Sequence, residues 1–181
     1  TIPVIDNFEE LDLLQEQIDG KFKIGIRIAA EEEPKFEFYT SRLGIGYKDI
    51  VPFYRKQIAE NKKVELKMLH FFINAGIRDT AYYWNELLKC MKVYIALKKE
   101  CPTLDSLNIG GGFPIKNSLA FDYDYQYMVD EILNQTKIAC DEAEVPVPHI
   151  FTEFGSFTVG EAGGALYQVL YQKKQNDREN W

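Results

Sequence analysis

The sequence lacks an excess of basic residues and any long hydrophobic run. Its 28 Asp and Glu outnumber 21 Lys and Arg, which gives a formal net charge of -7 and a pI of about 5.0. Without a basic patch, we expect no nucleic-acid partner. No apolar run reaches the ~18 residues of a membrane span, so we expect no membrane partner. The start, Thr1 to Ile5, lacks the charged region and cleavage site of a signal peptide.

The chain also lacks a cysteine framework. Its three cysteines, Cys90, Cys101 and Cys140, are odd in number and widely spaced, which fits neither a set of disulfides nor a zinc site. Thiols of this kind are typical of a reducing compartment, so we expect a cytoplasmic protein. We expect the three side chains to be buried packing residues rather than reactive groups.

The hydrophobic pattern alternates between strand-like and helix-like segments. With 181 residues, 46% of them hydrophobic, the chain can build one core but falls short of the ~250 residues of a complete eight-unit barrel. About five strands and four helices are expected, which predicts an α/β fold with parallel pairing and right-handed crossovers. The expected strands are 1–5, 22–30, 64–73, the stretch before Gly110, and 149–153; the expected helices lie near 8–18, 50–58, 79–100 and 122–143.

Two segments depart from this alternation. Residues 31–40 are polar and predict a surface loop. From Gly164, Leu166 to Gln172 alternate in the manner of an antiparallel strand rather than a helix.

Three consecutive glycines, Gly110, Gly111 and Gly112, follow a short apolar strand. Glycine permits positive φ and a close approach of the backbone, and successive N–H groups in such a turn can bind an anion, most often a phosphate. The alternative is an ordinary strand-to-helix turn without a ligand. The sequence around the turn favours a site, because Arg27, His70 and Glu153 also stand at or near carboxyl ends of strands, where parallel α/β folds bind their ligands.

Four segments, in order, resemble the barrel of pyridoxal-phosphate-dependent basic amino acid decarboxylases of the alanine-racemase-like fold, most nearly the biosynthetic arginine decarboxylases. The glycine strand Leu107 to Pro114 and the segment Ile150-Phe-Thr-Glu-Phe-Gly-Ser156 carry the more specific likeness. Ser41-Arg-Leu-Gly44 and Leu69-His-Phe-Phe-Ile-Asn-Ala-Gly76 resemble two further family motifs. This resemblance implies a partial (β/α)8 barrel in residues 1–163, with 164–181 leading to a separate β domain.

The resemblance also implies which residues bind pyridoxal phosphate. Glu153 would pair with the protonated pyridine nitrogen and keep the ring an electron sink. Each of three residues also has a structural alternative. Glu153 could be a carboxylate that caps a turn, and Arg27 could form an ion pair with the acids at 31–33. His70 could be a packed core histidine. The positions that the resemblance assigns to the cofactor are Gly110, Gly111, Gly112, Glu153, Arg27, His70, Phe72, Gly155 and Ser156.

Three positions differ from the family pattern. The ring-stacking histidine falls at Phe72, a phosphate-binding serine at Ala75, and a phosphate-binding arginine at Ser156. No lysine occupies the Schiff-base position, which the resemblance places before Thr1, so no catalytic residue is assigned in this chain. Lys67 is on a candidate strand, but its parity places it on the face opposite His70.

The implied reaction is decarboxylation of arginine to agmatine and CO2, as in polyamine biosynthesis, by a homo-oligomer. This stretch alone is expected to be inactive, and the unpaired edges of a partial barrel predict association. Pyridoxal phosphate is the implied cofactor, and magnesium is left open as a second. The alternatives are a non-catalytic or regulatory homologue that binds the cofactor or phosphate, and a barrel acting on a sugar phosphate.

Overall fold

In a computed structural model, the chain forms a parallel sheet covered by helices. The structure describes residues 1–30, 43–116, 121–175 and 178–180. The polar segment 31–40 and the first two residues of the Ser41-Arg-Leu-Gly44 motif therefore lie outside the described residues.

Strands and helices alternate along the first 162 residues, as expected. In chain order the elements are β1 (Val4–Ile5), α1 (Glu9–Gln17), β2 (Phe22–Ala29), β3 (Ile45–Gly46), α2 (Tyr47–Phe53), the π-helical turn η1 (Tyr54–Ile58), β4 (Val64–Phe71), α3 (Ala81–Lys98), β5 (Ser106–Asn108), α4 (Tyr125–Glu142), β6 (His149–Phe151), α5 (Gly155–Val159) and the 3-10 turn η2 (Gly160–Ala162).

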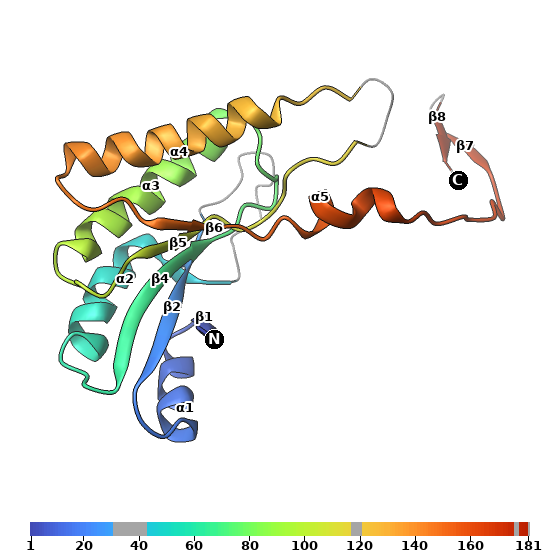
Figure 1. The fold of residues 1–181 in the computed structure, drawn as a ribbon. Coiled ribbons are helices and arrows are strands. Elements are labelled where there is room, and N and C mark those ends of the chain that lie inside the picture. The colour runs from blue at the N-terminus through green and yellow to red at the C-terminus, as the bar shows by residue number, and fades with distance from the viewer. Residues whose placement is uncertain (31–42, 117–120, 176–177, 181) are drawn as a thin grey trace.

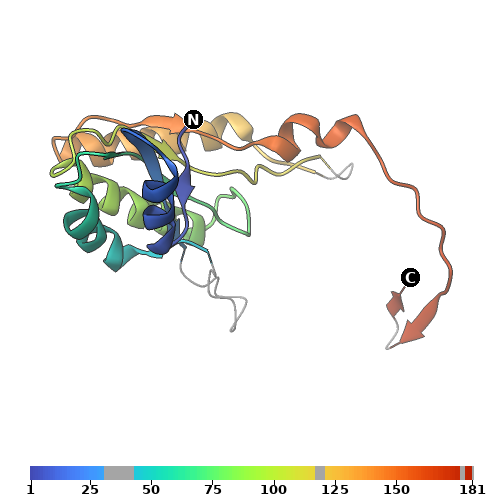
Figure 2. The same ribbon diagram turned by 90° about the horizontal axis from the view of Figure 1, so that it is seen from below.

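The main sheet is parallel throughout and has the order β1-β2-β4-β5-β6, with β3 paired to the end of β2. Helices α2, α3 and α4 lie together on one side of it (Figures 1 and 2). The prediction of about five parallel strands with covering helices is confirmed.

The core lies between the sheet and these helices. In β2, Ile24, Ile26 and Ile28 are fully buried, whereas Lys23 is exposed, which agrees with the predicted alternation. Leu69 in β4 and the other apolar residues in the same rows continue this buried face across the sheet. Each such side chain contributes roughly 1.5–3 kcal/mol by leaving water, so the core fixes which face of each strand points away from the helices.

Side-chain caps set where the long helices begin. Thr80 accepts a hydrogen bond from the N–H of Tyr83 at 3.2 Å and caps α3, and Asp124 accepts from Tyr127 at 2.9 Å and caps α4. The predicted helices at 79–100 and 122–143 begin two and three residues too early, because their first residues belong to the capping turns.

The predicted antiparallel strand over Leu166 to Gln172 is wrong. The structure assigns no strand there, and these residues are exposed as the chain leaves the sheet (Figure 2). A short antiparallel pair, β7 (Lys173–Gln175) with β8 (Arg178–Asn180), follows instead. An alternating pattern indicates a strand only where a neighbouring strand supplies hydrogen-bond partners, and 166–172 have no such neighbour in the described chain.

Candidate functional site

A row of side chains crosses the sheet near the carboxyl ends of its strands. Arg27 in β2 is in register with His70 in β4, His70 with Asn108 in β5, and Asn108 with Phe151 in β6. Residues in register share one face. In the preceding row, Ile26, Leu69 and Leu107 are fully buried, so that row belongs to the helix-covered face. The structure thus brings Arg27 and His70 together on the face away from the helices, next to the glycine turn.

The glycine turn packs against two neighbouring chain segments. A Cβ on Gly111 would lie 2.3 Å from the carbonyl oxygen of Glu153, and one on Gly112 would lie 2.9 Å from the Cα of Gly76. Gly110 and Gly112 also have positive φ, 69° and 105°. Three neighbouring strand ends meet at this turn, and only glycine lets their backbones approach one another this closely.

The turn presents backbone amide groups, two of which have no hydrogen-bond partner among the residues that the structure describes. The N–H of Gly110 donates to Asn108 Oδ1 at 2.8 Å. In the part of the chain that the structure describes, Gly111 and Gly112 donate their N–H groups to no other residue. Neighbouring amides of this kind form a cradle for an anion.

Glu153 lies beside this turn. Its N–H donates to the carbonyl of Gly110 at 2.8 Å, and its Oε1 accepts from Asn108 Nδ2 at 2.8 Å. Its side chain is 54% exposed, so the carboxylate remains accessible to a ligand. The predicted proximity of Glu153 to the glycines is confirmed.

His70 is buried, with 7% of its surface exposed, and its Nε2 has no hydrogen-bond partner in the described chain. Glu153 Oε1 lies 3.7 Å from this nitrogen, which is beyond hydrogen-bond distance. Burial lowers the pKa of His70 below its ordinary value; the Glu153 carboxylate opposes this shift and Arg27 reinforces it. Burial therefore favours the neutral imidazole of His70 at the edge of the site.

This lowered pKa predicts that the folded state loses stability in mild acid. As the pH falls below the ordinary value of 6.5, the unfolded chain takes up a proton at His70 before the folded chain does. We expect the His70 contribution to be fully present above about pH 6.5, and to be lost as the pH falls below that value and through the lower pKa of the folded state. Urea unfolding at pH 7.5 and 5.5 measures this loss, which should shrink in H70Q.

The matched control is H149Q, because His149 is exposed at the start of β6. Between the two pH values, H70Q should lose less stability than H149Q. An equal loss in H70Q would contradict the assignment of this pH dependence to His70.

An open hollow of about 1050 Å³ adjoins the glycine turn. Gly112, Ala75 and Ser156 line it, and Arg78 adds a positive charge to a wall that also carries acids. Phe72, at the end of β4, packs against the turn: its ring comes within 3.2 Å of where a Cβ on Gly110 would stand. The residues at the three positions that differ from the family pattern therefore all lie around this turn.

An aromatic cluster fixes α5 next to the turn. Phe113 stacks on Phe154 with ring centroids 4.2 Å apart, and Phe157 contacts its edge at 5.8 Å. Gly155 donates its N–H to the carbonyl of Glu153 at 2.8 Å, which turns the chain into α5. This packing places Ser156 on the wall of the hollow, where a hydroxyl replaces a guanidinium.

Two cations near the row pair with acids. Arg27 Nε lies 4.0 Å from Asp6 Oδ1, and acids 31–33, its proposed alternative partners, lie outside the described residues. Lys67 lies in β4, three residues before His70, and its ammonium group forms an ion pair with Asp105 at 2.5 Å. This ion pair holds the ammonium group away from the glycine turn.

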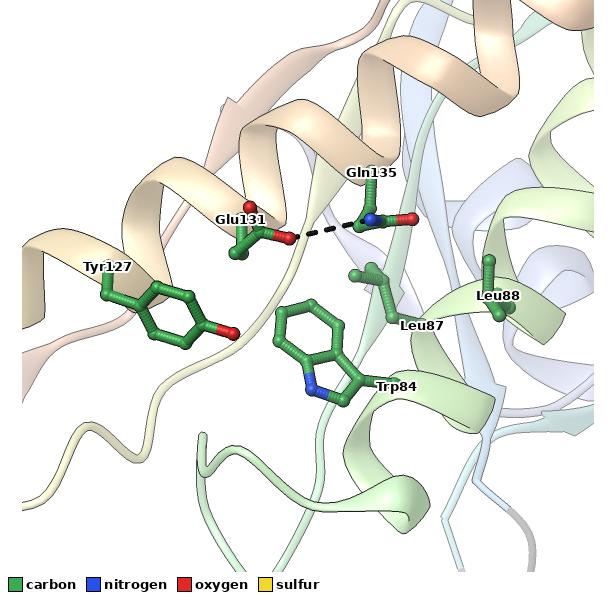
Figure 3. A pocket seen from close by; sticks show the side chains of 6 residues that line it. All are labelled: Trp84, Leu87, Leu88, Tyr127, Glu131 and Gln135. Carbon is green, nitrogen blue, oxygen red and sulfur yellow. Dashed lines mark hydrogen bonds between the residues drawn. The ribbon is translucent and has the colours of Figure 1, made fainter. Parts of the chain in front are cut away.

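A second hollow, of about 280 Å³, lies between α3 and α4. Trp84, Leu87 and Leu88 face Tyr127, Glu131 and Gln135 across it (Figure 3). Its polar groups are used locally: Gln135 donates to Glu131, and the Trp84 indole donates to Asp79 at 2.7 Å. None of the predicted site residues lies here.

The three cysteines are buried and free, as expected. The described residues contain no group of three or more His, Cys, Asp or Glu side chains that could hold a metal ion, so nothing in them supports magnesium. Among the described helices, none combines the length and apolarity needed to cross a membrane.

Comparison with known proteins places most of the chain in one family. Residues 1–160 match the family model described as "Pyridoxal-dependent decarboxylase, pyridoxal binding domain". The chain belongs to the pyridoxal-dependent decarboxylase family.

Relatives within the pyridoxal-dependent decarboxylases include two enzyme types. A biosynthetic arginine decarboxylase of Geobacter sp. (strain M21) is 25% identical over 84% of the chain and 26% of the relative. A diaminopimelate decarboxylase of Bacillus methanolicus is 30% identical over 94% of the chain and 42% of the relative. The chain thus spans between about a quarter and two fifths of the length of these relatives.

Solved structures support the fold. The diaminopimelate decarboxylase of M. jannaschii superposes with a TM-score of 0.73 at 20% identity, covering 97% of this chain and 42% of that one. The described residues therefore have the fold of part of a (β/α)8 barrel.

Sequence reasoning did not identify Asn108 as a site residue. A signal was present, because Asn108 is a polar residue within the apolar strand Leu107-Asn-Ile109, just before the glycines. What the sequence does not show is that this amide contacts both Gly110 and Glu153.

Proposed function

We propose that this chain is the barrel part of a pyridoxal-phosphate-dependent decarboxylase that converts arginine to agmatine and CO2. The observation that carries the proposal is the pairing of an amide cradle at Gly111 and Gly112 with an accessible carboxylate on the next strand end. A phosphorylated pyridine fits this pair of groups, because the cradle suits its phosphate and the carboxylate its protonated nitrogen. When bound, the cofactor supplies a ring that accepts the electron pair released as CO2 departs.

The chain's own residues would bind and orient this ring. Glu153 would hold a proton on the ring nitrogen, Phe72 would offer an apolar face to the ring, and Ser156 would donate one neutral hydrogen bond to the phosphate. Arg27 and His70 lie in register on the sheet face next to the glycine turn. Gly155 turns the chain from Glu153 into α5. The Schiff-base lysine is proposed to lie outside this chain, in a longer protein. That protein is proposed to be cytoplasmic and homo-oligomeric, and to continue after residue 163 into a β domain.

The proposal predicts that Glu153→Gln weakens binding of a cofactor analogue. The probe is 4-deoxypyridoxine 5′-phosphate, which has no aldehyde and needs no lysine. A hydrogen bond to a charged group contributes about 1.5–3 kcal/mol, so the dissociation constant should rise about tenfold to a hundredfold. Fluorescence titration measures it, with Glu161→Gln as control because Glu161 is exposed in η2. Equal affinity in E153Q and the unmodified chain would contradict the role of Glu153.

A diaminopimelate substrate is a second candidate, supported by the 30% identical relative from Bacillus methanolicus. Release of labelled CO2 from arginine or from diaminopimelate by the longer protein separates the two. A non-catalytic homologue is a third candidate, supported by Phe72, Ala75 and Ser156, since these remove polar contacts to a cofactor. It predicts binding of the analogue without release of CO2 from either amino acid.

A further inference from the structure

The side chain of Asn108 joins the two halves of the candidate site. Asn108 ends β5 and is 9% exposed. Its Oδ1 accepts a hydrogen bond from the N–H of Gly110 at 2.8 Å, and its Nδ2 donates to Glu153 Oε1 at 2.8 Å. One planar, buried amide therefore contacts both the glycine turn and the carboxylate on the neighbouring strand end.

The backbone fixes where Glu153 begins but not where its carboxylate lies. The N–H of Glu153 is bonded to the Gly110 carbonyl, and the Glu153 carbonyl packs against Gly111. The side chain is half exposed and has several rotatable bonds, so it would otherwise sample many rotamers. In the described chain, Asn108 is the one residue that donates a hydrogen bond to this carboxylate.

An amide of this length is suited to both contacts. An asparagine side chain accepts on one side and donates on the other, whereas a carboxylate only accepts and an apolar side chain does neither. His70 lies in register beside Asn108, but its Nε2 is 3.7 Å from Glu153 and does not replace the amide.

We propose that Asn108 is a positioning residue that fixes the spacing between the glycine turn and the Glu153 carboxylate, so that both can bind one phosphorylated pyridine. This inference rests on the proposed function. Asn108 itself contacts no ligand; it acts through the two groups that do. Preorganised groups bind more tightly than mobile ones, because the ordering cost is met during folding rather than on binding.

The test compares two probes, inorganic phosphate and 4-deoxypyridoxine 5′-phosphate. The affinity for the analogue divided by the affinity for inorganic phosphate measures what the ring adds to binding. This ratio is informative even if a variant also loosens the turn. We expect Asn108→Ala and Glu153→Ala each to lower this ratio about tenfold. The double variant should lower it no further, because both changes remove the same interaction. Absorbance of the bound ring should show less of the form protonated on nitrogen in each variant.

Two further variants keep the test decisive. Asn108→Ser keeps an oxygen that can accept from the Gly110 N–H but is too short to reach Glu153, so it should lower the ratio while the turn stays folded. Asn134→Ala is the control, because Asn134 is exposed on α4, and it should leave the ratio unchanged.

The outcomes separate the inference from the function on which it rests. If the ring adds no affinity over phosphate in the unmodified chain, the proposed function fails. If Glu153→Ala abolishes the ring's contribution while Asn108→Ala and Asn108→Ser retain it, only the role of Asn108 is overturned. Additive losses in the double variant would likewise overturn it, because independent residues do not share one interaction.

Discussion

Replacing Gly111 with alanine should destabilise the fold by about 3 kcal/mol or more, because the new methyl group has no space. Its Cβ would stand 2.3 Å from the carbonyl oxygen of Glu153 and 3.2 Å from the carbonyl carbon. Both atoms belong to the backbone, so the clash is relieved only if the ends of β5 and β6 separate. Urea unfolding at pH 7.5 measures the loss.

Gly163→Ala is the matched control for Gly111→Ala. An added Cβ there meets nothing within 4 Å, and φ at Gly163 is -150°, so the substitution should change stability by less than about 0.5 kcal/mol. If Gly111→Ala were as stable as Gly163→Ala, the described crossing of the turn and Glu153 would be incorrect.

The Gly111 result would not by itself show that the turn binds an anion. Close packing explains why Gly111 must be glycine even without a ligand. Within the described chain, the N–H groups of Gly111 and Gly112 have no hydrogen-bond partner. These amides and the neighbouring carboxylate support the cofactor proposal, and the binding experiments on Glu153 and Asn108 test it.

Replacing Leu107 with alanine should cost about 2–5 kcal/mol of the free energy of unfolding. Leu107 is fully buried and central in a strand of three residues, in register with Leu69 on one side and Ile150 on the other. It is the residue of β5 on the helix-covered face, so the cavity cannot be filled from within the strand. Because β5 leads into the glycine turn, the analogue should also bind more weakly.

Leu133→Ala provides the control for Leu107→Ala. Leu133 is 47% exposed on α4, so removing its side chain should cost less than about 0.5 kcal/mol and leave the analogue's affinity unchanged. Equal losses for the two leucines, measured by urea unfolding, would mean that β5 does not carry the packing described.

Within the pyridoxal-dependent decarboxylases, this chain is expected to differ from the family motifs at three positions. The resemblance implies that the turn and Glu153 match the family motifs, whereas Phe72, Ala75 and Ser156 stand where those motifs carry polar side chains. The hollow beside the turn also contains Arg78. Whether a decarboxylase can retain turnover with these replacements is decided by the CO2 assay on the longer protein.

The alternation of strands and helices and the grouping of Arg27, His70, Gly110 and Glu153 could be predicted from the sequence. Both follow from local information: hydrophobic period defines each element, and parallel topology gathers the carboxyl ends of the strands at one edge. The resemblance to the family also came from local motifs around these residues.

Tertiary structure decided the remaining features. The alternating residues 166–172 form no strand, because a strand depends on a partner that a local pattern cannot reveal. Gly111 is required by a carbonyl 42 residues later in the chain, and Asn108 matters because it reaches both Gly110 and Glu153. Contacts between residues far apart in sequence leave no periodic trace, so only the folded chain shows that one amide holds the turn and the carboxylate together.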